Sequence, residues 1–228
     1  MDLHPVVPGI YALPGMKMGR SYLIEDAHGL ALVDTSTQGC AARIFEAIDA
    51  LRRPARELHT IVATHYHLDH TGNVAALRER TGARLYVHTA DAPYVDGRMP
   101  WMAARGPLGG LAAHFGPRPY SLSVDGELHD GDVVPVAGEL TVVHLPGHTP
   151  GNIGLYSRAR GLVFTGDALM NVFGLRTPLD MSTHDPAQAR DSVRALAKMD
   201  FEVALPGHGA PIIGRASEKI RGWAERWL

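Results

Sequence analysis

Four side chains of types that bind metals fall within six residues, directly after an apolar segment. Residues 60–63 have the pattern of a buried strand, and they lead into His65, His67, Asp69 and His70. A loop that begins where a strand ends is anchored by the sheet, so it can hold ligands at defined positions. A lone His-x-His pair arises often by chance, whereas this spacing after a strand indicates a metal site.

Three more candidate ligands follow apolar segments farther along the chain. His148 comes after residues 140–143, and Asp167 and His208 each end a further apolar segment beside glycine. Each lies where a predicted strand gives way to a loop marked by glycine or proline. Glycine beside a ligand permits close approach of the backbone to a metal or a substrate. We expect one edge of a sheet to collect all seven side chains.

The combined pattern resembles the two-metal hydrolases of the metallo-β-lactamase superfamily, over about residues 10–208. The resemblance implies an α/β (α+β) fold, a four-layer αββα sandwich with the metals at one edge. It also implies two metal sites and a bridging carboxylate. The ligands would be His65, His67 and His148 at one site, Asp69, His70 and His208 at the other, and Asp167 between them.

The implied cofactors are two divalent metal ions. The mixture of imidazole and carboxylate ligands favours zinc, with iron and manganese as alternatives. Two cations about 3.5–4 Å apart need a shared anionic ligand, which suits Asp167. A metal-bound hydroxide would then attack a thioester, ester or lactone carbonyl with an apolar acyl part. Asp69 and Asp167 are the candidate catalytic residues, and Asp69 could also hold the proton of the nucleophile.

Two other activities on the same fold remain alternatives, a mononuclear-iron sulfur dioxygenase and a phosphodiesterase. True metallo-β-lactamases lack a bridging aspartate at the position of Asp167, which argues against an antibiotic hydrolase. Glyoxalase II has a helical C-terminal region that helps bind glutathione, and only 20 residues follow His208 here. Met170 stands where acyl-homoserine lactonases have a tyrosine.

One segment, at about residues 93–119, does not fit the plain fold. It is rich in apolar side chains, yet glycine and proline interrupt it repeatedly. It is predicted to form either an apolar lid or substrate wall, or a dimer contact or extra helices on the core. The candidate substrate contacts are Met99, Trp101, Met102 and Phe173.

Composition sets the remaining expectations. The chain has 228 residues, the size of one large domain over 1–228. A net charge of −2 gives no electrostatic case for nucleic acid, and no apolar segment is long enough to span a membrane. Cys40 is the only cysteine, which suits a reducing cytoplasm. We therefore expect a small-molecule substrate and a cytoplasmic location, with a homodimer as an open alternative.

Hydrophobic periodicity predicts helices over about 39–51, 74–80, 185–199 and 217–228. The hydroxyl groups of 35–37 are expected to cap the first helix. Asp185 followed by Pro186 marks the start of the third. Asp34 is either a partner that orients a ligand histidine or a turn residue at the end of a strand.

Overall fold

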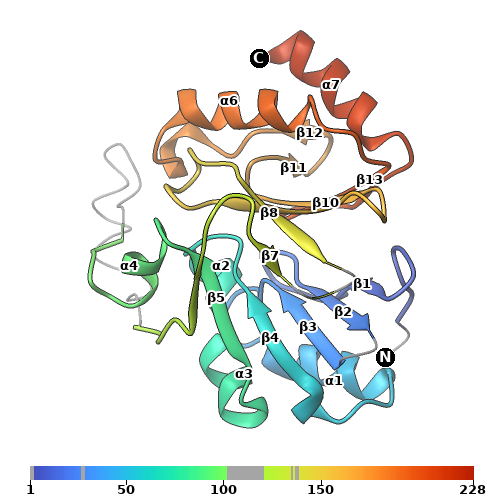
Figure 1. The fold of residues 1–228 in the computed structure, drawn as a ribbon, viewed down its shortest axis with the longest axis vertical. Helices are drawn as coiled ribbons and strands as arrows, with labels where there is room; N and C mark the ends of the chain where they lie inside the picture. Colours follow the sequence, from blue (N-terminus) through green and yellow to red (C-terminus); the bar gives the residue numbers. More distant parts are fainter. Residues whose placement is uncertain (1–2, 27–28, 102–120, 135, 137–138) are drawn as a thin grey trace.

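The computed structural model describes residues 3–26, 29–101, 121–134, 136 and 139–228. Over these residues the chain forms two stacked six-stranded sheets and a small two-stranded hairpin. Helices cover the outer side of each sheet (Figure 1). The expected four-layer αββα sandwich is therefore confirmed.

The first sheet has the strand order β1-β2-β3-β4-β5-β6. Its first three strands pair antiparallel, and β3 to β6 pair parallel. Near the N-terminus, residues 10–12 pair with β2. The strands are β1 (Ile10–Ala12), β2 (Tyr22–Asp26), β3 (Gly29–Val33), β4 (Leu58–Val62), β5 (Arg84–His88) and β6 (Gly126–Leu128).

The second sheet has the strand order β14-β13-β10-β9-β8-β7. All its neighbouring strands pair antiparallel except β10 and β13, which are parallel. Strands β9 and β10 form an antiparallel hairpin. The strands are β7 (Val133–Val134), β8 (Leu140–His144), β9 (Ile153–Ser157), β10 (Leu162–Gly166), β13 (Val203–Pro206) and β14 (Ile212–Ile213).

Two pairs of helices form the outer layers, and the four predicted helices are confirmed with small shifts of their ends. Beside the first sheet lie α1 (Ala41–Ala50) and α3 (Val74–Thr81). Beside the second lie α6 (Pro186–Leu196) and α7 (Ala216–Trp227) (Figure 1). The shorter elements are η1 (Ala55–Glu57), α2 (Leu68–Thr71), α4 (Ala92–Val95), β11 (Met170–Asn171), β12 (Leu175–Arg176) and η2 (Asp180–Ser182).

Three apolar cores separate the four layers, because the central strands are buried on both faces. In β3, Leu32 belongs to the core under α1 and α3, whereas Ala31 and Val33 face the core between the sheets. In β10, Phe164 lies between the sheets and Val163 packs in the third core, with α6 and α7. Alternate side chains of a strand point to opposite faces, so these apolar runs serve two cores each.

The two predicted helix starts differ in outcome. The side chain of Asp185 accepts hydrogen bonds from the backbone N–H groups of Ala187 and Gln188, which confirms this cap of α6. The expected hydroxyl cap of α1 is wrong. Instead, Asn73 Oδ1 accepts from Cys40 N and Ala41 N, at 3.0 Å each.

Part of the apolar segment predicted at 93–119 lies outside the described residues, including Met102. Its described beginning contains the end of α4 and a short extension to Trp101. Whether the whole segment is a lid or a dimer contact stays a prediction. Over the described residues, the structure contains no helix with the length and apolar character that crossing a membrane requires.

Candidate metal centre

The seven predicted ligands meet at the rim where the two sheets lie against each other, rather than at the edge of one sheet as expected. His65 and His67 follow β4 of the first sheet, and Asp69 and His70 lie in α2. The remaining ligands extend the second sheet: His148 follows β8, Asp167 follows β10, and His208 follows β13. The stacking of the sheets therefore brings the two sets of loops together.

Three histidines form the first cluster. His65 Nε2 lies 3.1 Å from His67 Nδ1, and His67 Nδ1 lies 2.9 Å from His148 Nε2. A tetrahedral zinc ion with Zn–N bonds of about 2.0–2.1 Å holds its nitrogen ligands about 3.3 Å apart. These two separations are close to the one that such a cation would impose, and all three ligand nitrogens lie within 4.8 Å of one another.

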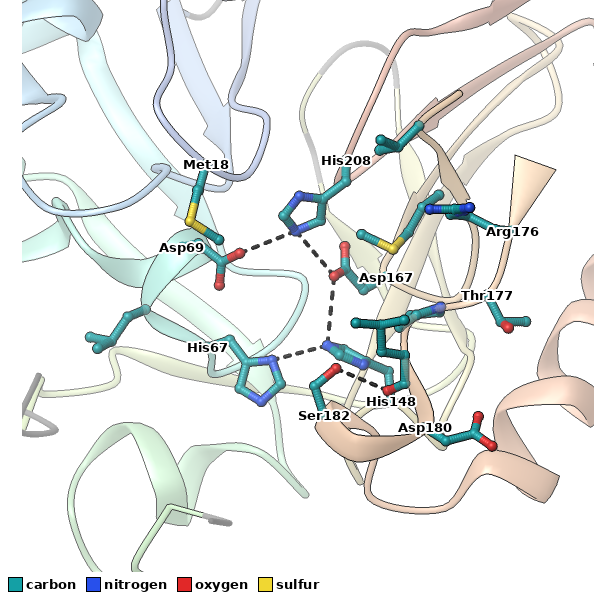
Figure 2. A pocket seen from close by; sticks show the side chains of 15 residues that line it. Met18, His67, Asp69, His148, Asp167, Arg176, Thr177, Asp180, Ser182 and His208 are labelled. Carbon is teal, nitrogen blue, oxygen red and sulfur yellow. Dashed lines mark hydrogen bonds and ion pairs between the residues drawn. The ribbon is translucent and has the colours of Figure 1, made fainter. Parts of the chain in front are cut away.

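Asp69, His70 and His208 form the second cluster, and Asp167 lies between the two (Figure 2). His208 Nε2 is 3.1 Å from Asp69 Oδ2 and 3.3 Å from His70 Nε2. Asp167 Oδ1 faces His70 Nε2 at 3.6 Å, and Asp167 Oδ2 faces His148 Nε2, also at 3.6 Å. One carboxylate thus faces ligands of both clusters.

Three of the ring nitrogens that point away from the centre have partners. His70 Nδ1 donates to Asp34 Oδ2 at 2.8 Å. His65 Nδ1 lies 3.1 Å from Thr64 Oγ1, which itself donates to Asp34 Oδ2. His148 Nδ1 lies 3.4 Å from Thr183 Oγ1. Such outer partners fix the tautomer that leaves the inner nitrogen free to bind a metal. Of the two roles considered for Asp34, the structure therefore supports the one in which it orients a ligand histidine.

The donor set fits divalent metal ions. Asp167 Oδ1 is buried and has no hydrogen-bond partner among the described residues, and a buried carboxylate oxygen without a partner is costly unless a cation or water satisfies it. Adding a Cβ to Gly207 would place it 2.2 Å from the same oxygen. The backbone therefore leaves this side of the carboxylate free of side chains. Number and identity of the ions stay predictions.

Charges within the centre are strongly coupled. Burial lowers the pKa of His67 to about 3, with help from His148. Burial also opposes protonation of His208, but Asp167 and Asp69 outweigh it and raise the pKa of His208 to about 10. In the same way, Asp34 and the two carboxylates raise the pKa of His70 to about 9. Two protons thus balance two carboxylates, a role that metal cations can take over.

Several residues that the sequence analysis did not single out hold the loops in place. Asn152 Oδ1 accepts from the backbone N–H of Asp167 at 3.0 Å. The hydroxyl of Tyr22 donates to Pro206 O at 2.8 Å, and Arg20 Nε donates to Gly209 O at 2.7 Å. The contacts of Arg20 and Tyr22 join the loop after β1 and the start of β2 to the loop that carries His208. They depend on contacts distant in sequence, which no local pattern signals.

A cavity of about 1180 Å³ opens beside the two clusters. His67, Asp69, His148, Asp167 and His208 line one side of it (Figure 2). Six of the other ten lining side chains are apolar, and eight of the ten come from the segment after Asp167. The rest of the lining is Met18, Leu68, Met170, Val172, Arg176, Thr177, Pro178, Leu179, Asp180 and Ser182.

Three of the four predicted substrate contacts lie elsewhere in the described structure, and Met102 is outside the described residues. Trp101 stacks edge-on against Tyr66 in the first core and donates from Nε1 to Tyr94 O. Met99 is 45% exposed and Phe173 is fully exposed, and neither lines the cavity. The described apolar wall is therefore formed by the segment from Met170 to Leu179, not by the beginning of the 93–119 segment.

The fold and the ligand pattern agree with one protein family. The model of that family, described as the metallo-beta-lactamase superfamily, matches residues 14–208. The chain belongs to the metallo-beta-lactamase superfamily.

Individual relatives show how far the likeness extends. A probable metallo-hydrolase of Bacillus subtilis, YflN, is 28% identical over 91% of this chain and 86% of its own length. The hydroxyacylglutathione hydrolase GloC of Haemophilus influenzae is 26% identical over 88% of this chain and 90% of its own length. A hydroxyacylglutathione hydrolase of Cereibacter sphaeroides is 34% identical, but the match covers 71% of this chain and 52% of that protein.

Solved structures agree with this assignment. A metallo-beta-lactamase family protein of Thermus thermophilus has a TM-score of 0.74 and 25% identity, covering 97% of this chain and 78% of its own. A subclass B3 metallo-beta-lactamase of Bradyrhizobium japonicum also has a TM-score of 0.74, at 23% identity, covering 99% of this chain and 90% of its own. At 23% identity, the likeness to the Bradyrhizobium japonicum enzyme concerns the fold alone. The family and the names of the curated relatives support a metal-dependent hydrolase.

Proposed function

We propose that the protein is a dinuclear metal-dependent hydrolase of thioesters, esters or lactones with an apolar acyl part. The observation that carries the proposal is the position of Asp167. Its Oδ2 lies 3.6 Å from His148 Nε2 of one cluster and 3.2 Å from His208 Nε2 of the other, and both clusters border the same cavity. When bound, two divalent cations would lower the pKa of a water molecule and polarise a carbonyl oxygen.

The residues of the chain then have separable roles. Asp69 lines the cavity, and its side chain is 22% exposed. Its carboxylate can accept the proton of an attacking water and return it to the leaving sulfur or oxygen. Because His70 and His208 lower the pKa of Asp69 by more than burial raises it, this carboxyl group stays ionised at neutral pH.

The lining of the cavity supports an acyl substrate. Met18, Val172 and Leu179 belong to its apolar part, and each buried methylene of a substrate contributes about 0.8 kcal/mol. Among the described lining residues, Arg176 is the only arginine or lysine, whereas phosphate recognition usually gathers several such cations. Two relatives are named hydroxyacylglutathione hydrolases, which supports a thioester within this class.

The test is a substrate panel on metal-loaded protein that compares thioesters, esters and lactones with a phosphodiester and a persulfide. We expect turnover of an acyl substrate, lowered about 10²- to 10⁴-fold in Asp69→Asn with the circular dichroism spectrum unchanged. Higher activity on the phosphodiester than on every acyl substrate would favour a phosphodiesterase. Oxygen-dependent consumption of the persulfide with a single bound iron would favour a sulfur dioxygenase.

A further inference from the structure

A fully buried carboxylate outside the ligand set joins two of the metal-ligand loops. Asp91 lies between β5 and α4 and has no exposed surface. Its Oδ2 accepts hydrogen bonds from Tyr66 N at 3.0 Å and from Thr149 Oγ1 at 2.8 Å. Its Oδ1 accepts from Gly151 N at 2.6 Å. Both carboxylate oxygens are thus used.

The three donors belong to the backbone and side chains next to the three-histidine cluster. Tyr66 lies between His65 and His67, and Thr149 directly follows His148. The first loop extends a strand of the first sheet, and the second joins β8 to β9 of the second sheet. Asp91 therefore connects the two parts of the chain that must keep a fixed separation for these histidines to share one cation.

A role for Asp91 as an ordinary helix cap does not account for these contacts. Asp91 occupies the N-cap position of α4, yet its side chain makes no capping hydrogen bond there. The loop also packs directly on Asp91, because a Cβ on Gly151 would lie 2.7 Å from Asp91 Cγ and 2.6 Å from Asp91 N.

The other cluster has a different anchor. His70 is held by Asp34, which also contacts Thr64, and the loop of His208 is held by Arg20 and Tyr22. Among the described residues, no hydrogen bond joins Asp91 to α2, which carries Asp69 and His70, or to the loop of His208. A change at Asp91 should therefore act unequally on the two clusters.

We propose that Asp91 is a positioning residue that sets the metal affinity of the His65, His67 and His148 site and not that of the Asp69, His70 and His208 site. The inference rests on the proposed function, because it presupposes a cation in each cluster. Asparagine at this position has nearly the same shape but only one acceptor oxygen, so at least one of the three hydrogen bonds would be lost. Loss of such outer contacts typically weakens a metal site about 10- to 100-fold.

The experiment is a cobalt titration of the metal-free protein followed by visible absorption. His148→Ala and His208→Ala, which each impair one cluster, provide the reference spectra that assign the two sites. Asp91→Asn should bind cobalt about 10- to 100-fold more weakly at the three-histidine site and within about twofold of wild type at the other. Thr149→Val, which removes one donor and keeps the side-chain shape, should shift the same site in the same direction by a smaller factor.

Asp125→Asn is the matched control for lost stability. Asp125 Oδ2 also accepts from a backbone N–H of β5, that of Leu85 at 2.8 Å, but at the end of the strand far from the centre. Equal weakening of both sites in Asp91→Asn, or the same pattern as in Asp125→Asn, would overturn the inference. If Asp91→Asn does not fold, an unchanged three-histidine site in Thr149→Val would overturn it. A wild-type protein that binds one cobalt ion would instead contradict the proposed function.

Discussion

The orientation of a ligand histidine depends on the partner of its outer nitrogen. Asp34 and Thr64 lie near the ligands in sequence or at a strand end, so they can be suspected from the sequence. Thr183, which faces His148 Nδ1, lies 35 residues away and carries no pattern of its own. Residue types and spacing thus predict which side chains come together, whereas the outer contacts require the folded chain.

Arg176 is the residue most suited to recognising an acidic substrate. Figure 2 shows it on the side of the cavity opposite His67 and Asp69. Its side chain forms no ion pair or hydrogen bond with the residues that the structure describes, so an anionic substrate group would not have to displace a partner. Charge-assisted hydrogen bonds of this kind are stronger than neutral ones, although exposure to solvent reduces their contribution.

We therefore predict that Arg176→Gln lowers kcat/KM about 3- to 10-fold for a thioester of mercaptopropionic acid, mainly through KM. The matched thioester of mercaptoethanol, which lacks the carboxylate, should be unaffected. Arg194→Gln removes the same charge from α6, outside the cavity, and is the control. Equal losses on both thioesters would show that Arg176 does not read the carboxylate.

At the scale of elements, the β11–β12 hairpin and the residues that lead into the 3-10 helix η2 form the described apolar wall. Val172 and Leu179 line the cavity, whereas Phe173 between them points to solvent. Phe173 has a φ of 54°, in the left-handed region that asparagine tolerates better than most residues. This arrangement offers two lining positions and one control position within a single short segment.

We predict that kcat/KM rises as an acyl chain lengthens by a few carbons, and that Val172→Ser and Leu179→Ser reduce this increase. The reason is the loss of apolar surface that a substrate methylene would contact. Phe173→Asn should leave the chain-length profile unchanged. A flatter profile in Phe173→Asn would instead restore this residue as a substrate contact, and an unchanged profile in both serine variants would remove the wall from substrate binding.

The helix starts show which elements can be predicted locally. The cap of α6 is encoded within four residues, where Asp185 accepts from N–H groups two and three positions ahead. The cap of α1 comes from Asn73, 33 positions beyond Cys40. Hydroxyl groups at 35–37 are near in sequence, but Thr35 Oγ1 donates to His70 O and Ser36 Oγ donates to Met18 O instead.

At the scale of the whole molecule, hydrophobic periodicity predicts the main helices, and the resemblance to a family predicts the four layers and their order. The rim shared by two sheets could not be deduced from spacing, because it depends on how the sheets stack. The same holds for Asp91 and for the cavity wall after Asp167. Both follow from contacts between parts of the chain that the sequence separates by dozens of residues.

A pair of histidines also joins the two sheets. His88 at the end of β5 stacks on His144 at the end of β8, with ring centroids 4.0 Å apart. Burial lowers the pKa of His88 to about 4, and His144 and His129 add to this effect, while Asp130 and Asp132 oppose it. The unfolded chain therefore binds more protons than the folded one between about pH 6.5 and pH 4.

This difference predicts that His88 contributes stability at neutral pH that is lost as the pH falls from about 6.5 towards 4. His88 Nδ1 accepts a hydrogen bond from Ala90 N. His88→Asn keeps an acceptor for this N–H group but removes the imidazole that titrates. As the pH falls across this range, the unfolding free energy of the wild type should decrease by about 1–3 kcal/mol relative to that of the variant. Urea denaturation at each pH measures this difference. His59→Asn, at an exposed position of β4, is the control. A constant difference would contradict the assignment.

The central claim is that two clusters joined by Asp167 each hold a metal ion. Elemental analysis of protein purified with excess metal tests it most directly. The account predicts two divalent ions per chain in the wild type, one in His208→Ala, and further loss in Asp167→Asn because both clusters lose a ligand. A single tightly held iron that is unchanged by His208→Ala would contradict it.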